Sequence, residues 1–401
     1  MNVYAPLVPV FVVALLAPLL TALMPTRSRL PQVVLLLLGG VLIGPSALGL
    51  AAPDDVTLLS DLGMGFLFLL AGYELEPSLF RERVGRLAGA AWCTSLLLAA
   101  VVVMVLIRPD EEEVLAAGAI ALTTTTLGVL LPILRDGGRL ESRFGRAVMV
   151  VGAYGELGPI VAMALLLGTR GSGAAALLLV VFAVLAVGVA LVPSFPAPRA
   201  GRLVLGAEHG TGQSTLRLTV LLLVGLLSVA SAFGFDAVLG AFVGGMVLRR
   251  WAPGDVSSLE KKLDAVAFGV FIPVFFVNSG MALDVASILA APGLPLLMFA
   301  LMVVVRGGPV LLWLRRELPA AERVQAALYS ATALPLLVAL TGIAVQRDLM
   351  STATGAALVG AGVLSVMVLP VVAGRIAARG PVTGDPARGD EGPGTTPRAR
   401  A

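Results

Sequence analysis

Long apolar runs alternate with short polar connectors over most of the chain, and this pattern predicts membrane-spanning helices. A spanning α-helix needs about 20 consecutive, mostly apolar residues, and thirteen runs approach that length. Their predicted limits are 5–24, 31–50, 57–74, 86–107, 114–134, 144–168, 173–193, 214–232, 235–249, 263–281, 293–314, 322–345 and 352–376. The first run lacks the basic start and the small-residue cleavage site of a secretory signal, so we expect a retained helix there. The predicted fold class is therefore an all-α polytopic membrane protein.

Basic residues fall almost entirely on one side of this predicted arrangement. The odd-numbered connectors and the C-terminal tail contain 24 of the 28 Lys and Arg residues. The connectors of the other side hold only Arg108, Arg170 and Arg347, beside acidic runs such as 110–113. Because cytoplasmic loops collect Lys and Arg, we expect the N-terminus outside and the C-terminus in the cytoplasm. Arginine far outnumbers the two lysines, which suggests a GC-rich prokaryote. The expected location is therefore the prokaryotic cell (inner) membrane.

Composition supports the membrane assignment and limits the partners. The chain is 58% hydrophobic and 13% charged, whereas soluble domains carry roughly 25% charged residues. The net charge of +3 is explained by the loop arginines, so nucleic acid is not implied. Cys93 is the only cysteine, which excludes an intramolecular disulfide and a thiol metal cluster. We assign 1–378 to one transmembrane domain and expect the Pro-, Gly- and charge-rich tail, 379–401, to be disordered.

The chain contains an internal repeat. The stretch FLFLLAGYELE at 66–76 aligns with VFFVNSGMALD at 274–284, an offset of 208 residues. The same offset places predicted segments three to six on segments ten to thirteen, so the copies extend over about 57–168 and 263–376. Seven helices separate the copies, an odd number, and the second copy is therefore expected to be inverted in the membrane. Inverted repeats are typical of secondary transporters, whose sites lie at the midplane where discontinuous helices meet.

Two charged residues lie at the middle of predicted helices. Glu156 is twelve residues into its segment and Arg306 is thirteen residues into its own. Charged side chains in the hydrocarbon core are rare and usually functional. Segment five also carries four threonines at 123–126, followed by Pro132, while segment twelve has Thr332 in the stretch SATALPLL. These residues predict locally unwound helices whose freed backbone groups line a polar cavity.

This combination predicts exchange of a cation for a proton. A carboxylate that releases H+ can bind a monovalent cation, while hydroxyls and backbone carbonyls supply neutral oxygens. Competition of both ions for Glu156 is the minimum mechanism of an antiporter. Arg306 cannot lose its proton, so its predicted role is electrostatic. Two blander interpretations stay open at this stage: a static ion pair between Glu156 and Arg306, and threonines that only bond to carbonyls of their own helix.

The sequence resembles the cation:proton antiporter superfamily, specifically the sodium/hydrogen exchanger membrane domain shared by Nap-type Na+/H+ antiporters and Kef-type K+ efflux proteins. The resemblance extends over about residues 8–376. Its five motifs occur in the family's order, at 29–50, 62–77, 121–147, 234–248 and 268–284. It implies the Na+/H+ antiporter fold with crossed discontinuous helices, and a homodimer in which a mobile core domain moves the ion against a scaffold domain. It implies no cofactor.

The resemblance also assigns roles to individual residues. The family's sixth helix bears a two-residue signature, Asp-Asp, Asn-Asp or Gln-Asp, whose second member binds the ion; here these positions are Gly155 and Glu156. The crossed helices place Thr124, Thr125 and Thr332 near the ion, and the family's basic residue in the core corresponds to Arg306. Gly155 departs from the family pattern. With one carboxylate remaining, we expect electroneutral exchange of one cation for one proton.

Several functions stay open from the sequence. The choice between Na+ and K+ is undecided, because glutamate adds a methylene to the usual aspartate and so changes the cavity. One alternative is Kef-like K+ efflux with a cytoplasmic regulatory subunit as partner. Another is a membrane sensor that uses the antiporter scaffold without transport. An enzyme is disfavoured, since no nucleophile–base constellation or metal-ligand cluster occurs in the sequence.

Overall fold

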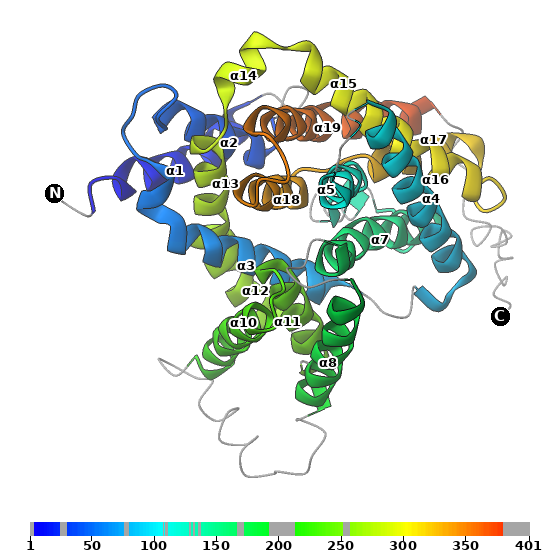
Figure 1. Ribbon diagram of the computed structural model, residues 1–401, viewed down its shortest axis with the longest axis horizontal. Helices are drawn as coiled ribbons and strands as arrows, with labels where there is room; N and C mark the ends of the chain where they lie inside the picture. The colour runs from blue at the N-terminus through cyan, green and yellow to red at the C-terminus, as the bar shows by residue number, and fades with distance from the viewer. Residues whose placement is uncertain are drawn as a thin grey trace, which may run out of the picture.

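The computed structural model describes residues 4–24, 30–75, 80–106, 108, 111–127, 130, 133–134, 138–166, 172–191, 213–251 and 257–379. The predicted disordered tail and Pro132 lie outside these residues. The described residues form helices and turns without a strand (Figure 1). The helices are α1 Leu7–Leu23, α2 Gln32–Ile43, α3 Thr57–Glu74, α4 Arg83–Leu106, α5 Glu112–Leu122, α7 Arg143–Leu166, α8 Ser172–Leu191, α10 Ser214–Ala232, α11 Ala237–Trp251, α12 Ser257–Val266, α13 Ile272–Met281, α14 Val285–Ala290, α15 Gly293–Met302, α16 Gly308–Trp313, α17 Ala320–Ser330, α18 Pro335–Gln346 and α19 Thr352–Arg379, with a 3₁₀ turn η1 Pro53–Val56 and π-helical turns η4 Ala267–Phe271 and η5 Val303–Gly307.

Eight helical stretches of the described residues are long and apolar enough to cross a membrane. They are Pro53–Glu74, Arg83–Leu106, Arg143–Leu166, Ser214–Ala232, Leu259–Met281, Gly293–Trp313, Ala320–Gln346 and Thr352–Ile376. Shorter apolar helices occur at Leu7–Leu23, Gln32–Ile43 and Ala176–Leu191. The all-helical, polytopic fold class is confirmed, whereas the number of thirteen spans stays a prediction.

The predicted helix over 31–50 is too long. Helix α2 ends at Ile43, and Gly44 has extended dihedral angles of φ −73° and ψ 179°. Pro45 follows directly in the sequence. A proline disfavours the helical conformation of the preceding residue, so the apolar run continues past the point where the helix ends.

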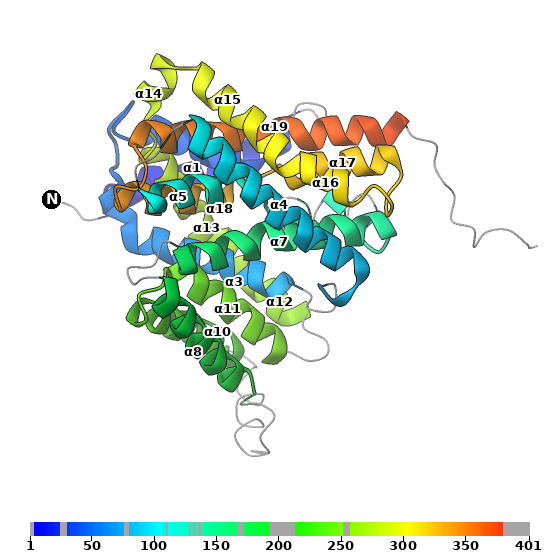
Figure 2. The ribbon, with the colours of Figure 1, turned by 45° about the vertical axis from the view of Figure 1, so that its right-hand side comes forward.

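The helices form two groups in space (Figure 1). Helices α1, α2, α3, α10, α11, α12 and α13 pack on one another, and α4, α5, α7 and α15 to α19 form the second group. Figure 2 shows α8, α10 and α11 on the far side of α3 from α15 and α19. Helix α8 contacts α11 of the first group and α7 of the second.

Glycines bring helix backbones of the first group into direct contact. A Cβ on Gly40 of α2 would lie 2.1 Å from a carbonyl oxygen of α13, and a Cβ on Gly280 of α13 would lie 2.1 Å from a carbonyl oxygen of α2. Gly72 of α3 and Gly245 of α11 form a second reciprocal pair, each with a carbonyl oxygen of the other helix 2.0 Å from the position of a Cβ. Only glycine fits at such contacts, which resemble the small-residue interfaces of membrane helices.

The second group contains two interrupted helices that match the internal repeat. Helix α5 ends at Leu122, residues 123–126 are not helical, and helix resumes at Leu127. Helix α17 ends at Ser330, residues 331–334 are not helical, and α18 begins at Pro335. Both interruptions lie at the offset of 208 residues that the sequence repeat shows. The predicted unwinding of segments five and twelve is therefore present, and the inverted orientation in a membrane stays a prediction.

Candidate functional site

The two interrupted segments hold each other through backbone and side-chain hydrogen bonds. The Thr126 amide donates to the Thr332 carbonyl at 2.9 Å, and the Leu334 amide donates to the Thr126 hydroxyl at 3.1 Å. The Ala333 amide donates to the Ser365 hydroxyl of α19 at 3.0 Å. These residues are all buried. Because buried backbone groups need partners, these bonds are what allows both helices to unwind inside the protein.

Glu156 of α7 lies beside the start of the helix that resumes at Leu127. Its side chain is buried, with the residue 5% exposed. Oε1 accepts a hydrogen bond from the Leu127 amide at 2.7 Å, and Oε2 has no hydrogen-bond partner. The N-terminus of a helix, with its free backbone N–H groups, favours negative charge. The site thus offers one fixed carboxylate oxygen and one buried oxygen that is open to a proton or a cation.

Arg306 is buried close by, with 1% exposure, and it bonds to neutral groups. Its Nε and Nη2 donate to the Thr125 hydroxyl at 3.1 and 2.8 Å. Nη2 also donates to the Val151 carbonyl at 3.3 Å. The static ion pair with Glu156, which the sequence left open, is not present among these contacts.

A π-helical turn directs Arg306 into the interior. The turn η5 spans Val303–Gly307, between α15 and α16, and Pro309 follows it. A proline lacks an amide hydrogen and its ring clashes with the carbonyl four residues earlier, and a wider turn accommodates this. Single π-turns are frequent at functional sites. The prediction from sequence placed Arg306 at mid-helix but missed this turn, although Gly307 and Pro309 could have indicated it.

The threonines predicted to lie near the ion have different roles in the structure. Thr125 is central: its amide donates to the Gly155 carbonyl at 2.9 Å and its hydroxyl donates to the Ser330 carbonyl. Thr124 donates to the Ala121 carbonyl of its own helix at 3.0 Å. Thr332 likewise donates to the Leu328 carbonyl at 3.3 Å. The hydroxyls of Thr124 and Thr332 therefore follow the blander interpretation, while the Thr332 carbonyl joins the two interrupted segments.

Three groups of the site were missed by reasoning from sequence. The hydroxyl of Ser365 and the carbonyl of Ser330 accept hydrogen bonds at the crossing, and the Leu127 amide binds Glu156. A serine within the apolar stretch VLSVMVLP was the available signal for Ser365. Backbone groups such as the Leu127 amide leave no signal in the residue type.

Ion pairs of the described residues lie away from this crossing. The buried Glu317 carboxylate binds Arg83 at 3.0 Å and Arg143 at 2.8 Å, which joins the N-terminal ends of α4 and α7 to the connector after α16. Asp236, just before α11, pairs with Arg347 at 3.6 Å, and its carboxylate accepts the Val238 amide at 3.1 Å.

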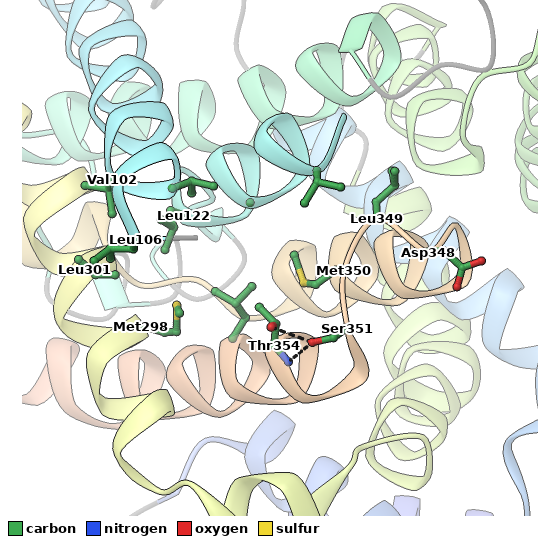
Figure 3. Close-up of a pocket in the computed structure, with 14 residues that line it drawn as sticks. Val102, Leu106, Leu122, Met298, Leu301, Asp348, Leu349, Met350, Ser351 and Thr354 are labelled. Atoms are coloured by element: carbon green, nitrogen blue, oxygen red, sulfur yellow. Dashed lines mark hydrogen bonds between the residues drawn. The ribbon is translucent and has the colours of Figure 1, made fainter. Parts of the chain in front are cut away.

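A cavity of about 300 Å³ lies at the end of α5 (Figure 3). It is lined by residues of α4, α5, α15 and α19 together with the connector 348–351. Leu122, the last residue of α5, borders it, and the polar Ser351 and Thr354 bond to each other (Figure 3). Within the described parts of the chain, no three His, Cys, Asp or Glu side chains gather as a resident metal site would need. The lining of the cavity is mostly apolar, whereas Glu156 has a buried carboxylate oxygen without a hydrogen-bond partner.

Comparisons with known proteins identify a family that matches nearly the whole chain. The family described as sodium/hydrogen exchanger, transmembrane, matches residues 11–379. The Na(+)/H(+) antiporter NhaS5 of Synechocystis is 29% identical over 70% of this chain and 40% of its own length. The Cation/H(+) antiporter 17 of Arabidopsis thaliana is 26% identical over 72% of this chain and 38% of its own length. These names describe transporters, in agreement with the prediction that the chain is not an enzyme.

A solved structure extends the comparison to the fold. The sodium proton antiporter MjNhaP1 from Methanocaldococcus jannaschii, at pH 8, aligns with a TM-score of 0.57 and 18% identity. The alignment covers 93% of this chain and 99% of that one. At this identity the likeness shows the fold alone. The chain spans about half the length, or less, of the curated relatives it matches first.

Proposed function

Because the chain belongs to the sodium/hydrogen exchanger transmembrane family, we propose that this integral membrane protein exchanges a monovalent cation, Na+ or K+, for H+. The observation that carries the proposal is the geometry of Glu156. Its carboxylate is buried beside two interrupted helices, with one oxygen bound by the Leu127 amide and the other without a partner. The name of the Arabidopsis relative leaves the cation unspecified, so both ions belong to the proposal.

The burial of Glu156 explains why transport is an exchange. An ionised carboxylate without a partner is costly in a low-dielectric interior. The site is therefore stable when the free oxygen holds a proton or a cation, and it returns across the membrane loaded with the other ion. One carboxylate binds one monovalent charge in either state. The exchange is one for one and electroneutral.

Further residues complete the proposed site. Arg306 supplies a fixed positive charge that balances the core, and its contacts with Thr125 support this role. Thr124, Thr125 and Thr332 supply oxygens or stabilise the unwound backbone, which their positions at the interruptions support. Gly155 replaces the first polar residue of the family signature.

The proposed assembly is a homodimer in a prokaryotic cell membrane, with the N-terminus outside and the C-terminus cytoplasmic. Residues 1–378 form the exchanger domain, with inverted repeats at about 57–168 and 263–376. The matched interruptions at 123–126 and 331–334 support the repeat. The two groups of helices support a mobile core and a scaffold.

The experiment is proton flux in proteoliposomes, followed by a pH-sensitive dye after addition of Na+ or K+. We expect cation-evoked flux in the wild type and in Glu113→Gln, a matched control whose glutamate is exposed. Glu156→Gln, which removes the charge and keeps the shape, should abolish the flux. A flux unchanged by an imposed membrane potential would support electroneutral exchange. Equal flux in Glu156→Gln and wild type would exclude Glu156 as the shared site.

A further inference from the structure

Gly155 lies where any side chain would collide with the site. A Cβ built on Gly155 would be 2.3 Å from the Thr125 hydroxyl oxygen and 2.4 Å from the Thr125 Cβ. It would also be 2.6 Å from Nη2 of Arg306. Cβ atoms essentially never approach other atoms so closely, so one of these groups would have to move. The space above Gly155 is thus already filled by Thr125 and Arg306.

The two groups that fill this space have little freedom to retreat. Thr125 is held by four hydrogen bonds: its amide donates to the Gly155 carbonyl, its hydroxyl donates to the Ser330 carbonyl, and the same hydroxyl accepts from Nε and Nη2 of Arg306. Arg306 is fixed by the same hydroxyl and by the Val151 carbonyl. Arginine fits because its planar head presents several donors in a rigid arrangement, which lysine lacks.

Thr125 also connects Arg306 to the carboxylate. Thr125 and Leu127 lie on one short stretch of chain, and the Leu127 amide donates to Glu156 Oε1 at 2.7 Å. Gly155 and Glu156 are neighbours on α7. A displacement of Thr125 therefore reaches Glu156 from both sides: through the Leu127 amide and through the Gly155 carbonyl that accepts the Thr125 amide.

We propose that Gly155 and Arg306 depend on each other. Because Gly155 has no side chain, the Arg306 guanidinium has room to bind the Thr125 hydroxyl, and this contact holds the Leu127 amide against Glu156. Arg306 is then a positioning residue for the ion site, acting through Thr125, and Gly155 determines whether it can act. The inference rests on the proposed exchange at Glu156. It adds that the affinity of the site for the cation is set by a residue that does not touch the carboxylate.

The test is a double-mutant cycle on cation affinity in proteoliposomes. Arg306→Lys keeps the charge and removes the planar guanidinium. Gly155→Ala places a methyl group in the space that Thr125 and Arg306 now occupy. Each alone should raise the KM for the cation by about 10-fold or more, as changes in groups that orient ion ligands do, while kcat changes little. In the Gly155→Ala background, Arg306→Lys should have little further effect, because the contact with Thr125 is already lost. If the double variant raises KM by the product of the two single-variant factors, the proposed dependence of Arg306 on Gly155 is refuted.

A matched control and a second route keep the test decisive. A Cβ on Gly308 meets nothing within 4 Å, so Gly308→Ala should leave KM unchanged and should multiply with Arg306→Lys. If Gly155→Ala does not fold, Thr125→Val and Thr125→Ser replace it. Thr125→Val removes the hydroxyl and should raise KM, and in this background Arg306→Lys should raise KM no further. Thr125→Ser keeps the hydroxyl, so it should have a KM near that of the wild type and should remain sensitive to Arg306→Lys. A wild type without flux would refute the proposed function, while an active wild type with multiplying effects would refute this inference alone.

Discussion

Replacing Thr126 by valine tests whether the two interrupted segments depend on each other. The Thr126 hydroxyl accepts the Leu334 amide at 3.1 Å, and Thr126 is 3% exposed. Valine has nearly the same shape, so the substitution leaves the packing in place. It removes the acceptor, and the Leu334 amide is left buried without a partner.

The expected magnitude follows from that unpaired amide. A buried donor without an acceptor costs about 1–3 kcal/mol, which lowers the ratio of folded to unfolded protein by about 5- to 150-fold. The same change at Thr124 is a matched control, because this hydroxyl donates to the Ala121 carbonyl and its loss leaves no amide unpaired. An under-satisfied carbonyl is better tolerated than an orphaned amide. Thr124→Val should therefore destabilise less than Thr126→Val.

Unfolding in detergent micelles by denaturant, followed by tryptophan fluorescence, measures this difference. Trp92 is a suitable reporter because its ring lies against Gly158 of α7. Gly158 follows Glu156 closely on the same helix. The midpoint of Thr126→Val should fall below that of Thr124→Val with a similar slope. Equal loss in the two variants would refute the reasoning, since only one of them strands a buried amide.

Three further predictions concern a second bond at the crossing, the pH dependence of transport, and an ion-pair cluster outside the site. Ser365→Ala removes the acceptor of the Ala333 amide and should lower the free energy of unfolding by about 1–3 kcal/mol in the same fluorescence assay. Lowering the pH by one unit should raise the KM for the cation up to about tenfold in proteoliposomes without lowering the maximal rate, because a cation ligand must be deprotonated and H+ competes for Glu156; a KM independent of pH would contradict this. Glu317→Gln should cost less than Ser365→Ala although the carboxylate is buried, because the arginines that it leaves, Arg83 and Arg143, are 68% and 65% exposed and stay solvated; an equal loss in the two variants would contradict this.

The helices were predictable because each needs a long apolar run. The predicted segments 57–74 and 214–232 coincide with α3 and α10. The interruptions were predictable as well, since threonines and a proline inside an apolar run weaken a helix at a definite place. The repeat added a second, independent indication of the same two places. The end of α2 at Ile43 was missed because hydropathy alone does not register the backbone angle of Gly44.

The composition of the site was predictable, and its contacts were not. Glu156 and Arg306 are conspicuous as charges in apolar segments, and Gly155 is conspicuous as a departure from the family pattern. Which groups meet depends on how α7, η5 and the two interruptions come together in space. The sequence therefore allowed an ion pair with Glu156, while the structure pairs Arg306 with Thr125 over the empty position of Gly155.

The glycine contacts of Gly40 with Gly280 and of Gly72 with Gly245 limit how this molecule can change shape. Each pair is reciprocal, so a carbonyl oxygen faces the bare Cα on both sides. Sliding α13 along α2 by one residue would bring a side chain onto that oxygen, and the same holds for α11 along α3. These contacts therefore allow only one register between the two helices of each pair. In the proposed exchange these helix pairs would therefore stay rigid, and displacement would occur where the two groups meet, at the contacts of α7 with α8 and α11.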